Sequence, residues 1–413
     1  MLALSTLPTD LAGSCAVVVG SARTGLAVVR ALCASGARVR LCDRRADAPI
    51  PGDLPAEVEV VLGTDGTELL DGAALVVPSP GVPVTAPILH AARARGIPIA
   101  SEVELAARAL EVPLVAITGT NGKSTTTSLV GEMLARSGRS VFVGGNLGTP
   151  LIDAVGGCFD VVVAEISSFQ LEWVDRLHPR VAAFLNVSDD HLDRHGDLAT
   201  YAGLKARLFA RQTAADVAVL NREDPWVDEA TRSVLSRRHS FGSSSRAPLA
   251  AEGECHAELR GPVLVLVEPD AEHRIDLARA PLMGRHNHEN FMAAALVARS
   301  FGVSAPDLQA AIDGFTGLRH RMEAVGEVRG VAYVDDSKGT NVGALLRALE
   351  PFADGRVVLI AGGLAKEGDY SAAREMLARK VRCIQIYGAA RDRSGCTRSE
   401  EHTSELQSRV DIS

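Results

Sequence analysis

The sequence lacks several features that would place it in other classes of protein. Basic residues do not exceed acidic ones, since 43 Lys and Arg stand against 51 Asp and Glu, and the net charge of −8 gives no reason to expect a nucleic-acid partner. No apolar run approaches the roughly 18 residues that a membrane span needs. The N-terminal MLALSTLPTDLAG has no basic start followed by a long apolar stretch, so we expect a cytoplasmic protein that is neither exported nor inserted into a membrane.

Cysteine and aromatic residues are also scarce. The seven cysteines form no CxxC pair in 413 residues, which excludes a disulfide scaffold and indicates reduced thiols. Aromatic residues make up 4% of the chain and glycine is frequent, with 38 residues, a composition typical of α/β proteins rather than of β-sandwiches. At roughly 150 residues per domain, the length predicts two or three domains.

Three segments repeat the order of strand, glycine-containing turn and helix that builds parallel sheets. The strands are expected at 16–19, 114–117 and 357–360, and the helices that follow them at 26–34, 125–136 and 371–380. We therefore predict an α/β fold of three domains, over residues 1–110, 111–316 and 317–397. Residues 240–260 have no periodicity and are expected to form a surface excursion.

The strongest functional signal is a phosphate-binding loop between the second predicted strand and its helix. Glycines let successive N–H groups face one anion, Lys123 reaches the outer phosphates and Ser124 is placed to bind Mg²⁺. Ile117 stands where the strict P-loop has a glycine, so the match is to the shorter GxxGK[ST] form. The alternative is a glycine-rich turn with an incidental lysine. The loop residues are Gly119, Thr120, Asn121, Gly122, Lys123, Ser124 and Thr125.

A carboxylate at a neighbouring strand end is the expected partner of such a loop. Residues 160–168 indicate a buried strand that ends at Glu165, where a carboxylate can bind Mg²⁺ between nucleotide oxygens. Taken alone, Glu165 is equally an ordinary acid at the end of a strand.

The segment 186–196 follows another apolar strand and holds three Asp and two His within seven residues, His191 among them. A solvated run of charges is the alternative interpretation. Farther along, Lys205 lies on a predicted helix, and its sequence neighbourhood indicates a surface lysine.

The N-terminal unit contains Gly20 and Gly25 in the spacing GxxxxG, which is a weak dinucleotide fingerprint because the usual form is GxGxxG. Asp43 follows the next apolar strand at the distance where an acid meets a ribose or a base. A nicotinamide dinucleotide site is therefore one possibility for this unit.

Taken together, these motifs resemble the Mur ligase family, the ATP-dependent enzymes that add amino acids to the peptide of bacterial cell-wall precursors. The resemblance rests on GTNGKST at 119–125 and extends to about residue 390. The segments 165–171, 186–196 and 336–341 are similar to the member that adds D-glutamate to UDP-N-acetylmuramoyl-L-alanine. The resemblance implies a Rossmann-like UDP-binding domain, a central P-loop ATPase-like domain with a mostly parallel sheet, and an incomplete Rossmann-like C-terminal domain.

The resemblance also implies roles for single residues. Lys123 would bind the γ-phosphate, Ser124 and Glu165 one Mg²⁺, and His191 a second Mg²⁺. Lys205 matches a lysine that CO₂ converts to a carbamate ligand of the second metal. Four further positions would complete the ATP site, Asn287, Asn290, Arg321 and Asp336, and two would face D-glutamate, Lys338 and Thr340. The positions that match contacts to the UDP-sugar are Arg23, Thr24, Asp43, Arg44, Ser79, Gly81, Asn146, Ser167 and Gln170.

The implied reaction is phosphorylation of a carboxylate by ATP, followed by attack of the D-glutamate amine on the acyl phosphate. Charge neutralisation by Lys123, two Mg²⁺ ions and a helix N-terminus suits this chemistry, whereas the sequence names no base for the amine. The partners are small molecules, and a monomer is expected. The alternatives are a folylpolyglutamate-type ligase, which would not need 110 residues ahead of the loop, and a nucleotide-binding module without turnover.

The C-terminal residues differ in character from the rest of the chain. Residues 398–413 resemble a translated sequencing adapter and have no apolar period, so we expect a non-native tail. The third domain would then hold three parallel strands at 331–334, 357–360 and 383–387, a thin sheet. We therefore expect the chain to bind ATP and the UDP-sugar but to ligate D-glutamate poorly or not at all, and full ligase activity would refute this.

Overall fold

The computed structural model describes residues 11–242, 254–282, 284–362 and 373–387. The chain divides into two compact units, Met1–Gly343 and Ala344–Ser413. The predicted tail at 398–413 lies outside the described residues. The domain boundaries at 110 and 316 therefore remain predictions.

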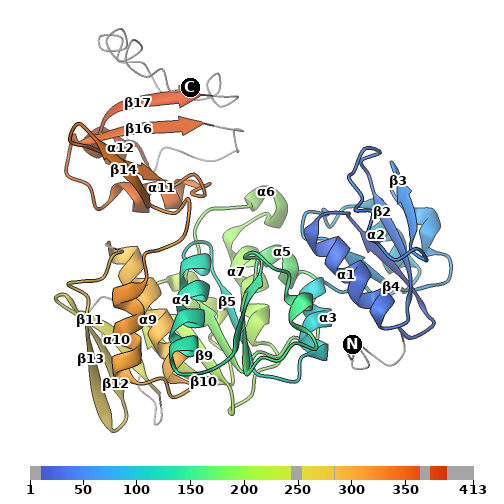
Figure 1. The fold of residues 1–413 in the computed structure, drawn as a ribbon, viewed down its shortest axis with the longest axis horizontal. Coiled ribbons are helices and arrows are strands. Elements are labelled where there is room, and N and C mark those ends of the chain that lie inside the picture. The colour runs from blue at the N-terminus through green and yellow to red at the C-terminus, as the bar shows by residue number, and fades with distance from the viewer. Residues whose placement is uncertain (1–10, 243–253, 283, 363–372, 388–413) are drawn as a thin grey trace. The chain divides into compact units, whose positions relative to one another are not determined.

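The first unit begins with a four-stranded parallel sheet in the order β3-β2-β1-β4 (Figure 1). Its first β-turn-α unit follows the sequence prediction closely, because a buried strand leads through a glycine turn into an amphipathic helix. The strands are β1 (Cys15–Val19), β2 (Arg38–Asp43), β3 (Glu59–Leu62) and β4 (Ala73–Pro78), and the helices are α1 (Arg23–Ala34), α2 (Pro87–Ala94) and α3 (Glu102–Ala109).

A nine-stranded sheet follows, in the order β13-β12-β11-β10-β9-β8-β5-β7-β6. Neighbouring strands are parallel from β6 to β11, and the pairs β11–β12 and β12–β13 are antiparallel, which confirms the mostly parallel sheet. Its strands are β5 (Leu114–Thr118), β6 (Val141–Gly145), β7 (Val161–Glu165), β8 (Val181–Phe184), β9 (Val217–Asn221), β10 (Arg237–Phe241), β11 (His256–Arg260), β12 (Val263–Glu268) and β13 (Ala271–Asp276). The predicted surface excursion at 240–260 is wrong at both ends, which belong to β10 and β11.

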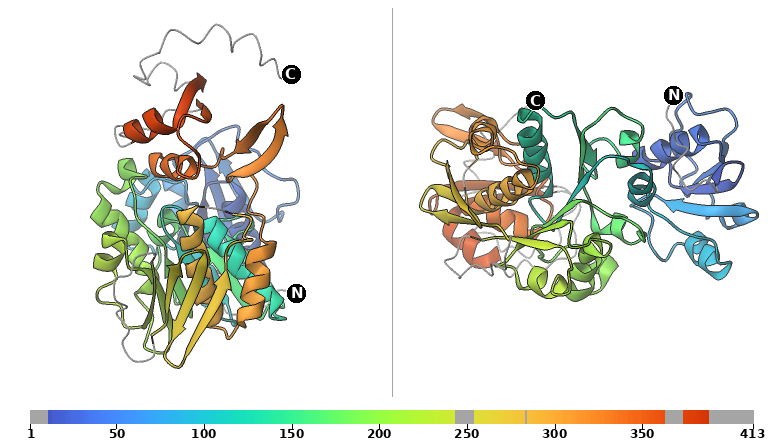
Figure 2. Two further views of the ribbon diagram at one scale, coloured as in Figure 1. Left: turned by 90° about the vertical axis from the view of Figure 1, so that its left-hand side faces the viewer. Right: turned by 90° about the horizontal axis from the view of Figure 1, so that it is seen from below.

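Helices cover both faces of this sheet, with α4, α9 and α10 on one side and α7 on the other (Figure 2). Strand β5 is apolar throughout because both of its faces are buried. Val115 and Ile117 pack under α4, and Ala116 packs on the opposite face. None of the helices in the described part of the chain is long and apolar enough to cross a membrane. The helices are α4 (Lys123–Arg136), α5 (Ser168–Leu171), α6 (Leu192–His195), α7 (Leu198–Ala206), α8 (Pro225–Ala230), α9 (Arg285–Arg299) and α10 (Ala305–Gly314).

The strand predicted at 331–334 does not join a parallel sheet. It forms β15 (Val331–Asp335), which pairs antiparallel with β14 (Glu323–Val328). Arg329 and Gly330 connect the two strands and both have positive φ, at 51° and 79°, as a two-residue hairpin turn requires. The expectation of three parallel strands is therefore wrong.

In the second unit, β16 (Val357–Gly362) and β17 (Val381–Tyr387) pair in parallel. Helix α12 (Arg374–Lys380) leads directly into β17, and α11 (Val342–Leu349) begins at the boundary between the two units.

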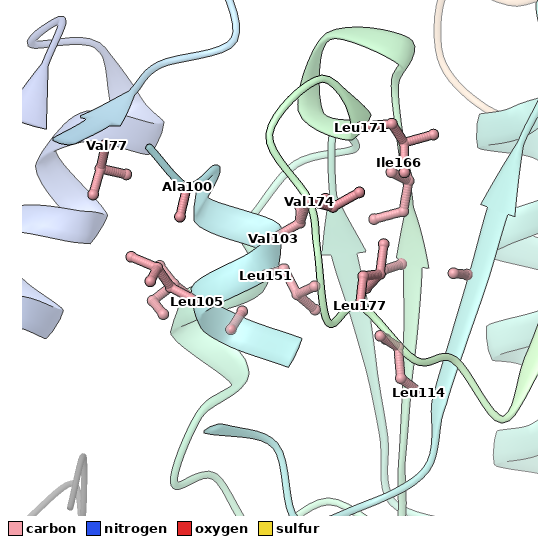
Figure 3. Close-up of a cluster of buried hydrophobic side chains, with 14 of the residues drawn as sticks. Val77, Ala100, Val103, Leu105, Leu114, Leu151, Ile166, Leu171, Val174 and Leu177 are labelled. Carbon is pink, nitrogen blue, oxygen red and sulfur yellow. The ribbon is translucent and has the colours of Figure 1, made fainter. Parts of the chain in front are cut away.

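Helix α3 joins the two sheets of the first unit through one continuous buried cluster. Figure 3 shows Val103 and Leu105 of α3 between Val77 of β4 and Leu151 and Val174 of the central part. All five residues are at most 4% exposed. The N-terminal and central parts therefore share a hydrophobic core.

The same helix contributes a buried carboxylate. Glu104, with a side chain 1% exposed, accepts hydrogen bonds from the backbone N–H groups of Asp175, Arg176 and Leu177 at 2.9–3.1 Å and pairs with Arg108. One side chain thus satisfies three backbone donors, of which the N–H of Leu177 is buried.

We expect Glu104→Ala to lower the free energy of unfolding by about 3 kcal/mol, because it removes the acceptor of three backbone N–H groups, the buried one of Leu177 among them, and the partner of Arg108. Glu132→Ala is the matched control, since Glu132 also forms an i,i+4 pair with an arginine but is 43% exposed. This control should cost at most about 0.5 kcal/mol. Denaturant titration measures both variants, and equal losses would contradict the assigned role of Glu104.

Candidate active site

The phosphate-binding loop lies where β5 ends and α4 begins. Gly122 is the N-cap of α4, with a φ of 84°, and Lys123 is the first helical residue. The Lys123 Nζ donates to the carbonyl oxygens of Gly119 and Thr120, each at 2.8 Å, so its charge lies over the loop. Burial lowers the pKa of Lys123, an effect that the Glu165 carboxylate opposes and the Arg321 guanidinium reinforces. The loop thus presents backbone donors, a helix N-terminus and a cation at one place.

Gly122 has no room for a side chain. A Cβ there would lie 2.2 Å from the Asn290 Oδ1, an atom of α9. Gly138, at the other end of α4, has nearly the same φ of 85°, but a Cβ there would have nothing within 4 Å. A substitution at either glycine therefore strains the backbone, but only a substitution at Gly122 also crowds the loop.

We expect Gly122→Ala to weaken ATP binding by at least about tenfold, because the new methyl group must displace Asn290 and distort the phosphate cradle. Gly138→Ala should lose similar stability from its positive φ and keep the ATP affinity of the unmodified chain. Titration calorimetry with ATP measures both. Equal affinities in the two variants would refute the assigned loop.

A second set of groups surrounds Ser124 at the end of β7. The Ser124 Oγ donates to the Glu165 Oε2 at 2.7 Å, and the Asn146 Nδ2 donates to the Glu165 Oε1 at 2.6 Å. The Arg321 Nη2 donates to the Ser124 Oγ at 3.2 Å. Hydroxyl and carboxylate oxygens are the ligands that Mg²⁺ prefers, so Ser124 and Glu165 fit one Mg²⁺ site.

Lys205 is not the surface lysine that its sequence neighbourhood indicated. It is 1% exposed, and its Nζ donates to the Gly119 carbonyl oxygen at 2.9 Å and lies 4.3 Å from the centre of the Tyr201 ring. Burial moves the pKa of Lys205 well below its ordinary value, and the like charge of Lys123 lowers it further. The carboxylates of Asp190 and Glu165 act in the opposite direction but do not offset the burial. The amine is therefore held beside the phosphate loop in a setting that favours its neutral form.

His191 is the N-cap of α6, with a positive φ of 57°, and it lies beside two side chains. Its Nε2 is 3.6 Å from the Asp190 Oδ2, and its ring meets the Phe169 ring edge-on with centroids 4.7 Å apart. Among the described residues, the one group of three His, Asp or Glu ligands within 4.8 Å of one another is His320, Glu323 and Asp335, which includes none of the predicted ligands. A second metal held by His191 and Lys205 therefore remains a prediction.

Two residues that the sequence interpretation did not assign hold the phosphate loop in place. The Asn186 Oδ1 accepts from the Asn121 N–H at 2.9 Å, and its Nδ2 donates to the Asn121 carbonyl at 3.1 Å. The Ser188 N–H donates to the Thr120 Oγ1 at 3.0 Å. Both lie in the segment after β8, where no local sequence pattern distinguishes them from the charged residues that follow.

Of the other predicted ATP residues, Asn290 lies at the loop, Asn287 lies beside Asn290, and Asp336 lies beside Met322. Asn290 of α9 lies at Gly122 and accepts from the Thr126 Oγ1 at 3.3 Å, and its Nδ2 lies 3.4 Å from the Asn287 Oδ1. The Asp336 Oδ1 accepts from the Met322 N–H at 3.1 Å, next to Arg321. Lys338 and Thr340 are exposed on the segment after β15.

The residues predicted to contact the UDP-sugar fall into two groups. Near β1, the Asp43 Oδ2 accepts from the N–H and Oγ of Ser21, and the Ser79 Oγ donates to the Gly20 carbonyl at 3.2 Å. Burial acts to raise the pKa of Asp43, but the hydrogen bonds from Ser21 and Arg45 outweigh it and hold the pKa below its ordinary value. Thr24 is half-buried and Gly81 is exposed.

The second group lies at the central sheet. Ser167 and Gln170 form a capping box at α5, and Asn146 lies at Glu165. The Arg23 Nη1 donates to the Gly148 carbonyl at 2.7 Å and so links both groups, whereas Arg44 pairs with Asp65 at the surface. Their roles toward a ligand remain predictions.

Two family models match this chain. The model of the Mur ligase middle domain matches residues 117–298, and that of the MurD-like N-terminal domain of Mur ligases matches residues 14–101. The chain is 46% identical over 389 residues to UDP-N-acetylmuramoylalanine--D-glutamate ligase of Anaeromyxobacter dehalogenans, covering 92% of this chain and 84% of that protein. It is 43% identical to the protein of the same name from Geobacter metallireducens, covering 93% and 84%.

Solved structures show the same fold at low sequence identity. MurF from Acinetobacter baumannii superposes with a TM-score of 0.57 at 19% identity, covering 91% of this chain and 78% of that one. MurC from Thermotoga maritima gives a TM-score of 0.51 at 18% identity, covering 90% and 84%.

Proposed function

Because the chain belongs to the Mur ligase family, we propose that it is an ATP-dependent ligase that joins D-glutamate to UDP-N-acetylmuramoyl-L-alanine in peptidoglycan precursor synthesis. The observation that carries the proposal is the meeting of Lys123, Ser124 and Glu165 at one loop, with Arg321 bonded to Ser124. The match of residues 14–101 to a MurD-like N-terminal domain argues against the folylpolyglutamate-type alternative, which needs no such domain.

The first step joins a carboxylate oxygen of the UDP-sugar substrate to the γ-phosphorus of ATP and releases ADP. Both reactants are anions, so the main tasks are to position them and to neutralise their charge. Lys123 and Arg321 supply cations at the phosphates, and the N-terminus of α4 adds its dipole. Ser124 and Glu165 would hold Mg²⁺, which supplies positive charge between the nucleotide oxygens when bound.

In the second step the D-glutamate amine attacks the acyl carbon, phosphate leaves, and the amine gives up one proton. Lys338 and Thr340 are proposed to face D-glutamate. Lys205 is proposed to carry a carbamate, formed when its neutral amine attacks CO₂ and releases a proton, and to act with His191 at a second metal. Burial of the Lys205 amine beside Gly119 supports this assignment.

We also propose that the chain works as a monomer in the cytoplasm. The six cysteines within the described residues are all free thiols, as a reducing compartment implies. ATP and UDP-sugars are cytoplasmic metabolites, which agrees with this location.

ADP release with single substrates omitted tests the function. We expect release only when ATP, UDP-N-acetylmuramoyl-L-alanine and D-glutamate are all present, and this dependence, not the size of the rate, is the criterion. ADP release without regard to D-glutamate would contradict the ligase assignment. Binding of both nucleotides without any turnover would favour the nucleotide-binding module.

A further inference from the structure

Arg194 lies at a junction of three segments that carry predicted substrate contacts. Its guanidinium makes a bidentate pair with Glu172, Nε to Oε1 at 2.8 Å and Nη2 to Oε2 at 2.5 Å. The Nη2 also donates to the Val82 carbonyl at 2.9 Å. The side chains of Arg194 and Glu172 are only 13% and 6% exposed, so the pair is largely shielded from water.

The bond to Val82 reaches the N-terminal sheet. Val82 closes a turn after β4, in which its N–H donates to the Ser79 carbonyl at 3.0 Å. Ser79 in turn bonds through its Oγ to the Gly20 carbonyl, in the glycine turn of β1. Arg194 therefore holds the turn that carries two predicted UDP-sugar positions, Ser79 and Gly81.

The guanidinium also fixes an aromatic side chain of the central part. Its Cζ lies 4.3 Å from the centre of the Phe169 ring, which also contacts the rings of His191 and His195. Phe169 lies between Ser168 and Gln170 on α5, so the same contact orients the capping box of Ser167 and Gln170. One side chain thereby contacts two segments, the turn at 79–82 and α5, that carry predicted UDP-sugar residues of both groups.

We propose that Arg194 is a positioning residue for the UDP-sugar substrate, which it serves by fixing the turn at 79–82 to α5 without itself belonging to the phosphate loop. The inference rests on the proposed function, since it takes the UDP-sugar as the ligand. It predicts that loss of the bidentate fork weakens UDP-sugar binding and leaves ATP binding unchanged.

Arg194→Lys tests this, because lysine keeps the charge but cannot make two parallel bonds to Glu172 and a third to Val82. We expect the dissociation constant for UDP-N-acetylmuramoyl-L-alanine to rise by about tenfold, and that for ATP to stay unchanged, in titration calorimetry.

Arg207→Lys is the matched control. Arg207 donates to the backbone carbonyls of Glu172 and Val174, so it supports the same segment without touching Phe169 or Val82. It should lower the thermal midpoint as Arg194→Lys does, and it should keep both affinities. Equal UDP-sugar affinities in the two variants would overturn the proposal. So would a loss of ATP affinity in Arg194→Lys as large as its loss of UDP-sugar affinity.

A second variant covers the case in which Arg194→Lys does not fold. Glu172→Gln keeps the size of the side chain and removes its charge, so it should also weaken UDP-sugar binding selectively; unchanged binding would overturn the proposal. Turnover of the unmodified chain is measured alongside. Turnover that does not depend on D-glutamate, with intact UDP-sugar binding, refutes the proposed function alone, whereas an unmodified chain that binds no UDP-sugar refutes both.

Discussion

Replacing Lys123 by alanine is expected to lower kcat by about a thousandfold, with the affinity for the UDP-sugar substrate unchanged. The amine lies over the loop carbonyls of Gly119 and Thr120, where a phosphate chain would meet it. The phosphates gain charge in the transition state, so the loss falls mainly on kcat. The predicted UDP-sugar positions belong to other elements, which is why that affinity should persist.

Single-turnover kinetics and calorimetry with the UDP-sugar measure the two quantities separately. A Lys123→Ala chain that keeps its rate would refute the assignment of the phosphate loop. Loss of UDP-sugar binding in the same variant would refute the placing of that substrate on the N-terminal sheet.

Lys205→Ala should be nearly inactive, with kcat lowered by at least about a hundredfold, and added formate or acetate should restore part of the rate. Truncation removes the whole buried side chain beside Gly119, so a small carboxylate has room to supply the missing oxygen ligand. Chloride at the same ionic strength controls for salt. Normal rates in this variant would show that Lys205 has no role in the reaction.

The carbamate itself has an independent readout. Incubation with ¹³CO₂ should give a carbamate carbon signal in the NMR spectrum of the unmodified chain, and Lys205→Ala should lack it. Lys205→Arg should be inactive and should not respond to formate, because the guanidinium fills the space and is not a nucleophile for CO₂. A carbamate signal that persists without Lys205 would move the modification to another amine.

Local sequence patterns predicted the β-turn-α units to within a few residues. The predicted helices at 26–34 and 125–136 begin earlier in the structure, at Arg23 and Lys123. Helix α1 includes Gly25, which the sequence prediction placed in the turn, and α4 starts directly after Gly122. The strand at 331–334 was found, but its partner was not. Arg329 and Gly330 are a hairpin signal that periodicity alone does not reveal.

Long-range contacts explain the site features that local patterns missed. Lys205 is buried by Tyr201 and by the Gly119 carbonyl, which lies 86 residues away in the chain. Glu104 has the position of an ordinary first-turn acid of a helix, yet it is buried against backbone N–H groups some 71–73 residues away. Neither burial is visible in the residues next to these side chains, because it arises from the packing of separate elements.

The most direct test of the central claim follows one oxygen atom through the reaction. UDP-N-acetylmuramoyl-L-alanine labelled with ¹⁸O in its free carboxylate is incubated with ATP, Mg²⁺ and D-glutamate, and the nucleotide product and phosphate are analysed by mass spectrometry. The account predicts a product carrying D-glutamate and one ¹⁸O in the phosphate released with it. ADP release with unlabelled phosphate, or without a product containing D-glutamate, would contradict it.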